Sequence, residues 1–127
     1  MKLSKIFFLL AIAAIGFTSC RKDEGVMSMA GTWEGRWGFG YETPSFFEKW
    51  ELKKDGDLNS FYPNGEVYAV GSWECDGEDF EAHYTPIGEN YTYTFTGSYD
   101  EDDDEITGVW GESQDPTNGG TFEMQRR

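Results

Sequence analysis

The stretch from Gly31 to Phe39, G-T-W-E-G-R-W-G-F, constrains the fold of this chain more than any other segment. Its bulky apolar residues alternate with polar ones, so Trp33, Trp37 and Phe39 fall on one face of an extended strand. A two-residue period is the pattern of a half-buried β-strand. Gly35 lies on the same face between the two tryptophans, where a missing side chain suits a curved sheet. The stretch therefore predicts the first strand of a curved β-sheet.

The rest of the chain repeats this pattern, and no segment has a helical period. Turn sequences at Asp55-Gly56, Pro63-Asn64-Gly65 and Asp76-Gly77 separate the apolar runs. Short strands at regular spacing indicate an all-β domain. We expect a small up-and-down antiparallel β-barrel of about eight strands. The predicted strands are 31–39, 45–53, 57–62, 66–75, 79–86, 91–100, 106–111 and 120–126.

The hairpin at Asp76-Gly77 allows the register of its two strands to be predicted, whereas strand 57–62 leaves two alternatives. With Asp76-Gly77 at the centre of a turn, the flanking strands place apolar pairs on the inward face, and a slip of one residue would bring charged residues inward. In strand 57–62, either Tyr62 faces inward together with Leu58 and Ser60, or a bulge brings in Phe61 instead. The pairs predicted around the turn are Trp73 with Phe80, Gly71 with Ala82, and Ala69 with Tyr84.

The N-terminus has the layout of an export signal. Lys2 and Lys5 precede the apolar run Ile6–Phe17, which is too short to span a bilayer, and small residues lead to Cys20. A cysteine in this position resembles the lipobox of bacterial lipoproteins. The resemblance implies cleavage of a signal peptide at 1–19 and acylation of Cys20, whereas the alternative is an ordinary signal peptide with an incidental cysteine. Residues 20–30 would then link the anchor to one domain at 31–127.

The four residues after Cys20, Arg21–Glu24, resemble the short basic-plus-acidic tag of surface lipoproteins in the Bacteroidetes. That resemblance implies a location on the outer membrane, at the cell surface or alternatively on its periplasmic face. No other segment is amphipathic or membrane-spanning, so we expect the acyl chains to be the only membrane attachment.

The net negative charge of the chain limits which molecules it can bind. The chain has 24 acidic residues against 10 Lys and Arg, a formal charge of −14, and loss of the leader would remove two of the lysines. Nucleic-acid binding needs basic surface and is excluded. With Cys20 acylated, Cys75 would have no partner for an intrachain disulfide. We expect a monomeric exported domain.

No metal site is predicted. Asp55, Asp57 and Asn59, followed by Glu66, superficially resemble a calcium loop, but the sixth position lacks glycine and no helices flank it. A hairpin turn explains these acids. The six consecutive acids at 100–105 suit a solvated turn that keeps strand edges from aggregating, with weak cation binding as the alternative.

No catalytic arrangement is predicted either. His83 is the only histidine and the register places it outward, whereas Cys75 faces inward, so a Cys–His nucleophilic pair is not expected. We expect neither enzymatic activity nor a cofactor.

Gly31, Trp33 and Arg126 together resemble the lipocalin-like (calycin) barrels, which open with Gly-x-Trp and pack an arginine from near the last strand across that tryptophan. In an even-stranded up-and-down barrel the first strand begins where the last one ends, so Arg126 would reach Trp33. The chain is shorter than a usual lipocalin and lacks the following helix. Gly-Thr-Trp also opens avidin-like barrels, but Gly35 and Phe39 replace the polar residues of that biotin site, so biotin binding is not implied.

Following the strands back and forth assigns each inward residue to one end of the barrel. The closed end, nearest the anchor, would hold Trp33, Trp73, Cys75, Phe80, Tyr99, Ile106 and Arg126. The opposite mouth would be rimmed by loops 40–44, 63–65, 87–90 and 112–119. Its predicted ligand-binding residues are Phe39, Tyr41, Phe46, Tyr62, Tyr84, Tyr91, Tyr93 and Trp110.

A barrel of eight strands has room for side chains or one small ligand, and we expect this one to be mostly filled. The aromatic mouth suggests a non-catalytic module that binds a small apolar or sugar-like ligand. Such aromatics also cap the core of many small barrels. The alternative function is a protein-interaction module, a hydrolase inhibitor or accessory subunit, that presents loop 112–119.

Overall fold

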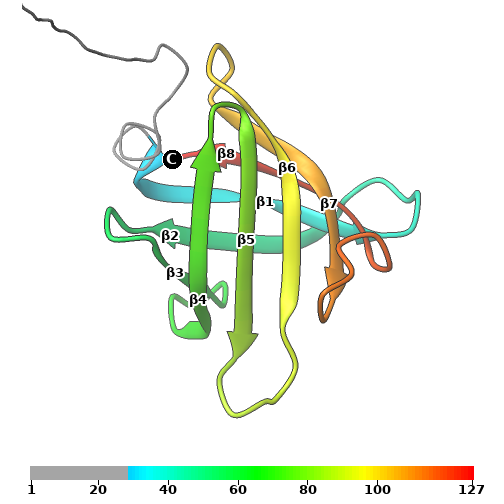
Figure 1. Cartoon of the computed structure of the whole chain (residues 1–127). Helices are drawn as coiled ribbons and strands as arrows, with labels where there is room; N and C mark the ends of the chain where they lie inside the picture. The colour runs from blue at the N-terminus through cyan, green and yellow to red at the C-terminus, as the bar shows by residue number, and fades with distance from the viewer. Residues whose placement is uncertain (1–28) are drawn as a thin grey trace, which may run out of the picture.

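A computed structural model describes residues 29–127, and the predictions for the signal peptide, Cys20 and the Arg21–Glu24 tag lie outside these residues. The described chain is an all-antiparallel, up-and-down barrel in which each strand pairs with the next and the last pairs with the first (Figure 1). The predicted fold class is confirmed. Within residues 29–127, no helix is long and apolar enough to cross a membrane. The strands are β1 (Gly31–Phe39), β2 (Phe46–Leu52), β3 (Asp57–Phe61), β4 (Val67–Asp76), β5 (Asp79–Pro86), β6 (Tyr93–Asp100), β7 (Glu105–Glu112) and β8 (Gly120–Arg126).

The short turns follow from their glycines. Gly56 and Gly65 have φ angles of 94° and 92°, a left-handed conformation that glycine adopts without steric cost. The Gly56 amide donates to the Lys53 carbonyl at 3.0 Å, and the Gly65 amide donates to the Tyr62 carbonyl at 2.9 Å. Each glycine thus ends a three-residue hairpin loop, as the sequence predicts.

The predicted register of β4 and β5 is wrong by two residues. The central turn residues are Gly77 and Glu78, between the paired Asp76 and Asp79, because Gly77 takes the positive φ of 65° required at the first loop position. Side-chain alternation distinguishes only odd from even shifts, so the same residues still face inward. The observed pairs include Gly71 with Tyr84, Trp73 with Ala82, and Cys75 with Phe80.

In β3, Leu58 and Ser60 are buried, whereas Tyr62 lies beyond the strand and is 47% exposed. The pairing with β4 shifts between Ser60 and Phe61, which leaves Tyr68 as the extra residue of a bulge. The strand therefore combines features of both predicted alternatives.

Glycines within the strands allow neighbouring backbones to approach closely. A Cβ atom on Gly71 would lie 1.8 Å from the His83 carbonyl oxygen, and one on Gly108 would lie 2.0 Å from that of Thr96. These contacts are too short for any side chain, so the glycines of the Gly-x-Trp triplets at 71–73 and 108–110 are needed for barrel curvature.

The core is aromatic and has Trp50 near its centre. This side chain is fully buried, and its ring centroid lies 5.8 Å from that of Phe80, 5.2 Å from Phe95 and 5.8 Å from Phe122. Four strands thus contribute to one cluster, a geometry in which aromatic pairs add to the stability gained from burial.

Candidate functional site

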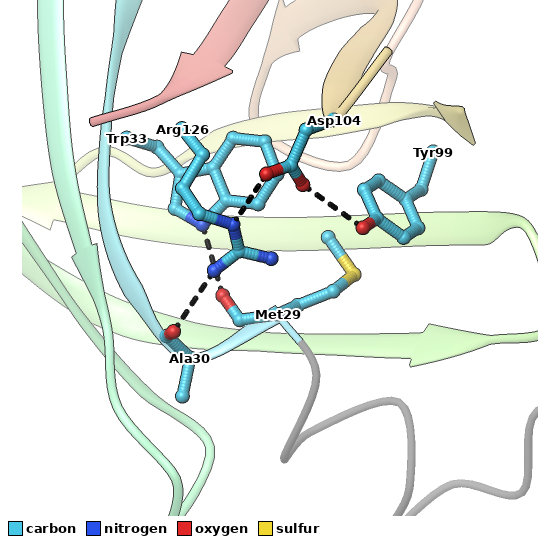
Figure 2. A network of polar contacts seen from close by, with 6 residues as sticks. All are labelled: Met29, Ala30, Trp33, Tyr99, Asp104 and Arg126. Carbon is cyan, nitrogen blue, oxygen red and sulfur yellow. Dashed lines mark hydrogen bonds and ion pairs between the residues drawn. The ribbon is translucent and has the colours of Figure 1, made fainter. Parts of the chain in front are cut away.

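The closed end has the contact expected from the resemblance to lipocalins. Trp33 and Arg126 are direct partners in the β1–β8 ladder, and the guanidinium carbon lies 4.6 Å from the centroid of the Trp33 ring (Figure 2). Arg126 also donates to the Ala30 carbonyl at 3.0 Å, and Trp33 Nε1 donates to the Met29 carbonyl at 2.9 Å. The segment that precedes β1 is therefore bound to this end of the barrel.

One residue of the acidic run belongs to the same network. Asp104 accepts a hydrogen bond from Arg126 Nε at 2.8 Å and another from the Tyr99 hydroxyl at 3.0 Å (Figure 2). Partial burial of the Tyr99 hydroxyl raises its pKa, and the hydrogen bond to Asp104 raises it further. The exposed residues 100–103 fit the predicted solvated turn, whereas Asp104 is partly buried and contacts Arg126 and Tyr99.

Cys75 and His83 do not form a nucleophilic pair. The Cys75 thiol is buried and donates to the Gly77 carbonyl at 3.2 Å, whereas His83 contacts Glu81 and Thr94 on the outer face. Among residues 29–127, no three His, Cys, Asp or Glu side chains are grouped to hold a metal ion.

The opposite end of the barrel contains an open pocket of about 330 Å³. The core around Trp50 is filled, in line with the expectation of a mostly filled barrel, and the open space lies at this end. The pocket, called the mouth pocket below, is lined by Trp37, Phe39, Phe47, Glu48, Ser60, Phe61, Tyr62, Pro63, Tyr68, Tyr84, Tyr93, Phe95, Trp110 and Glu112.

Five of the eight predicted ligand-binding residues line the mouth pocket, and three do not. Tyr41 is fully exposed on the loop after β1. Phe46 stacks on Trp37 at a centroid distance of 4.6 Å, and Tyr91 contacts Tyr93 at 5.5 Å, both outside the lining. The five that line it are Phe39, Tyr62, Tyr84, Tyr93 and Trp110.

The aromatic walls of the mouth pocket are held by contacts among themselves. Trp110 lies 5.1 Å from Trp37 and 5.9 Å from Tyr93, between ring centroids, and its Nε1 donates to the Gly38 carbonyl at 3.0 Å. On the other side, Tyr68 lies 6.0 Å from Tyr84. The β4 bulge at Tyr68, which sequence patterning cannot locate, supplies this second wall.

Sequence reasoning missed the most unusual residue of the mouth pocket, Glu48. Its side chain is only 4% exposed, and three donors reach the same carboxylate oxygen, Oε2. These are Trp50 Nε1 at 2.5 Å, the Tyr84 hydroxyl at 2.8 Å and the Ser60 hydroxyl at 3.4 Å. None of the described residues donates to Oε1. The mouth pocket therefore has a buried carboxylate in its wall, with all three donors on one of its two oxygens.

Burial raises the pKa of Glu48 from 4.5 to about 7, against the three hydrogen bonds, which lower it. Burial also raises the pKa of Tyr84, and the neighbouring Glu48 charge raises it further. Near neutral pH the Glu48 carboxyl therefore exists in both its neutral and its ionised form. The sequence did carry a signal, since Glu48 has the same parity as Trp50 and Leu52, and a glutamate in a buried set is rare.

Loop 112–119 is folded against the barrel. Ser113 donates to the Thr92 carbonyl at 2.6 Å, and its own carbonyl accepts from the Thr94 hydroxyl at 2.6 Å. Asp115 accepts from both the amide and the hydroxyl of Thr117. The loop is thus fixed by local hydrogen bonds along β6.

In comparisons with known proteins, no family model, no curated protein and no solved structure matches this chain. The lipocalin-like description therefore rests on the closed eight-stranded barrel and the Trp33–Arg126 contact.

Proposed function

We propose that this protein is a non-catalytic binding module that takes a small ligand with an apolar or sugar-like body. The observation that carries the proposal is the open, aromatic mouth pocket of about 330 Å³. Small-molecule sites are typically concave, largely apolar and furnished with a few polar groups, and this volume lies near the lower end of their range. Ring faces such as those of Trp37, Tyr68 and Trp110 suit apolar groups and sugar rings.

We further propose that an acylated Cys20 anchors the module to the outer membrane, at the cell surface or on the periplasmic face. The acylation rests on the lipobox-like position of Cys20. The attachment of Met29 and Ala30 to the closed end through Trp33 and Arg126 supports the orientation. Ten residues extend to at most about 36 Å, so the anchor would hold the closed end near the membrane. The mouth pocket would then be directed away from it.

A second candidate is a protein-interaction module, such as a hydrolase inhibitor or an accessory subunit. It is favoured by exposed aromatic side chains at this end of the barrel: Tyr41 is fully exposed, Phe46 is 46% exposed, and Phe39, which also lines the mouth pocket, is 51% exposed. Exposed aromatic clusters are common in protein interfaces. This candidate would use the rim, and loop 112–119 would contribute from its position along β6.

A ligand screen distinguishes the two candidates. We expect compounds among fatty acids, small aromatic compounds and mono- or disaccharides to raise the melting temperature and change tryptophan fluorescence. Tyr93→Ala, in the wall, should weaken binding about tenfold or more, which corresponds to about 1.4 kcal/mol. Tyr41→Ala, on the rim, should leave it unchanged. Absence of any response at millimolar concentrations would refute small-ligand binding, whereas sensitivity of partner binding to Tyr41→Ala alone would favour the second candidate.

A further inference from the structure

We propose that the mouth pocket selects a small organic cation, an ammonium group on an apolar body, and that the ammonium donates to Oε1 of Glu48. This inference rests on the proposed small-ligand function and narrows its ligand class. The first observation is the one-sided hydrogen bonding of Glu48, in which Oε2 takes three donors and Oε1 takes none from residues 29–127. A buried carboxylate in the wall of a pocket, with one oxygen to which no described residue donates, favours a ligand that brings the donor.

The charges around the mouth pocket favour a cation over a neutral or anionic ligand. Two carboxyl groups, those of Glu48 and Glu112, line it, and no lysine or arginine among residues 29–127 does. The chain as a whole has a formal charge of −14. A cleft lined by one sign of charge concentrates ligands of the opposite sign. An anionic ligand would meet both carboxyl groups without a basic partner.

The aromatic walls strengthen the same preference. Trp37 and Trp110 from one side and Tyr68 from the other line the pocket that contains Glu48. The faces of aromatic rings attract cations, most strongly where water is excluded. A hydroxyl group could also donate to Oε1, but it would leave the buried charge uncompensated and gain nothing from the ring faces. An ammonium group satisfies the oxygen, the charge and the walls together.

The other titratable groups that face Glu48 do not supply this cation. Burial raises the pKa of Tyr84 on β5, of Tyr68 on β4 and of Tyr93 on β6, so these phenols stay neutral at physiological pH. Within the described part of the chain, the other ionisable residues in the lining are Glu112 on β7 and Tyr62. Glu48 exists in both protonation states near pH 7. Binding of an ammonium ligand should therefore shift the carboxyl to its ionised form, so that the Glu48 proton is released to solvent.

Three probes with the same ring and chain length test the inference: 2-phenylethylamine, 2-phenylethanol and phenylacetate. By isothermal titration calorimetry at pH 7, we expect the amine to bind about tenfold or more tightly than the alcohol, and phenylacetate not to bind. Glu48→Gln keeps an acceptor for Trp50 and Tyr84 but removes the charge. The affinity for the amine should therefore fall to about the affinity for the alcohol. Glu51→Gln, on the same strand, removes an equal charge outside the pocket and should preserve the preference.

A measurement on the unaltered protein covers the case in which Glu48→Gln fails to fold. Calorimetry in two buffers of different ionisation enthalpy should show proton release with 2-phenylethylamine and none with 2-phenylethanol. Equal affinity for amine and alcohol, or amine binding without proton release, would overturn the cation inference and leave small-ligand binding intact. Binding of none of the three probes would also overturn it, and the wider ligand screen would then decide the proposed function separately.

Discussion

The buried carboxyl of Glu48 predicts an unusual dependence of stability on pH. Its pKa is about 7 in the folded protein, against an ordinary value of 4.5 that we assign to the unfolded chain. Between these values the folded state binds more protons than the unfolded state, so the contribution of Glu48 to the free energy of unfolding falls as pH rises. Each pKa unit corresponds to about 1.4 kcal/mol, which gives a total loss of about 3 kcal/mol.

Glu48→Gln isolates this contribution, because the amide has nearly the same shape and does not titrate. We expect the free energy of unfolding of the wild-type protein, relative to that of Glu48→Gln, to fall by about 2.5 kcal/mol between pH 5 and pH 8. The loss should level off above pH 7, where both states are ionised. Urea unfolding followed by tryptophan fluorescence measures each stability.

The variant Glu51→Gln is the matched control. It removes the same formal charge from the same strand. Its free energy of unfolding relative to wild type should stay nearly constant between pH 5 and pH 8. If the difference between wild type and Glu48→Gln were also constant from pH 5 to pH 8, the Glu48 carboxyl would not titrate with a raised pKa, and the electrostatic argument for the mouth pocket would be wrong.

Three further predictions concern the anchor and the barrel. Cys20→Ala should move the protein from the membrane fraction to the soluble fraction, and continued membrane association would contradict acylation. Trp33→Ala should lower the free energy of unfolding by about 3–5 kcal/mol, as large core truncations do, and near wild-type stability in urea would show that Trp33 is not part of the core. Gly71→Ala should cost about 3 kcal/mol or more, because its Cβ would lie 1.8 Å from the His83 carbonyl oxygen. Val70→Ala on the exposed face should change stability little, and equal effects of these two variants would refute the close-approach argument.

The sequence by itself determined which residues of most strands face the core, including the strands that contain Trp33, Trp73, Phe95 and Phe122. Alternation of apolar and polar residues distinguishes the two faces of a strand, and glycine-containing turns mark where strands reverse. From these rules the strands containing Trp33, Trp73 and Phe122 were predicted, and chain topology brought Arg126 beside Trp33. These features need only local chemistry and the even number of strands.

The tertiary structure decided the register between strands, the β4 bulge and the depth of the mouth pocket. Shifts of two residues leave the inward face unchanged, so the pairing of Gly71 with Tyr84 depends on the conformation of Gly77. The hydrogen bond between Asp104 and Arg126 depends similarly on the shape of the turn that contains Asp104.

Glu48 shows most clearly what the sequence pattern cannot determine. Its parity in the sequence places it inward, but alternation cannot say whether an inward glutamate is neutralised by a cation, solvated or enclosed. Those outcomes depend on distances between β2, β3 and β5, which set three donors on one oxygen and place the carboxylate in the wall of the mouth pocket. Because desolvation and hydrogen bonding are properties of the assembled barrel, the chemistry of this site arises only in the tertiary structure.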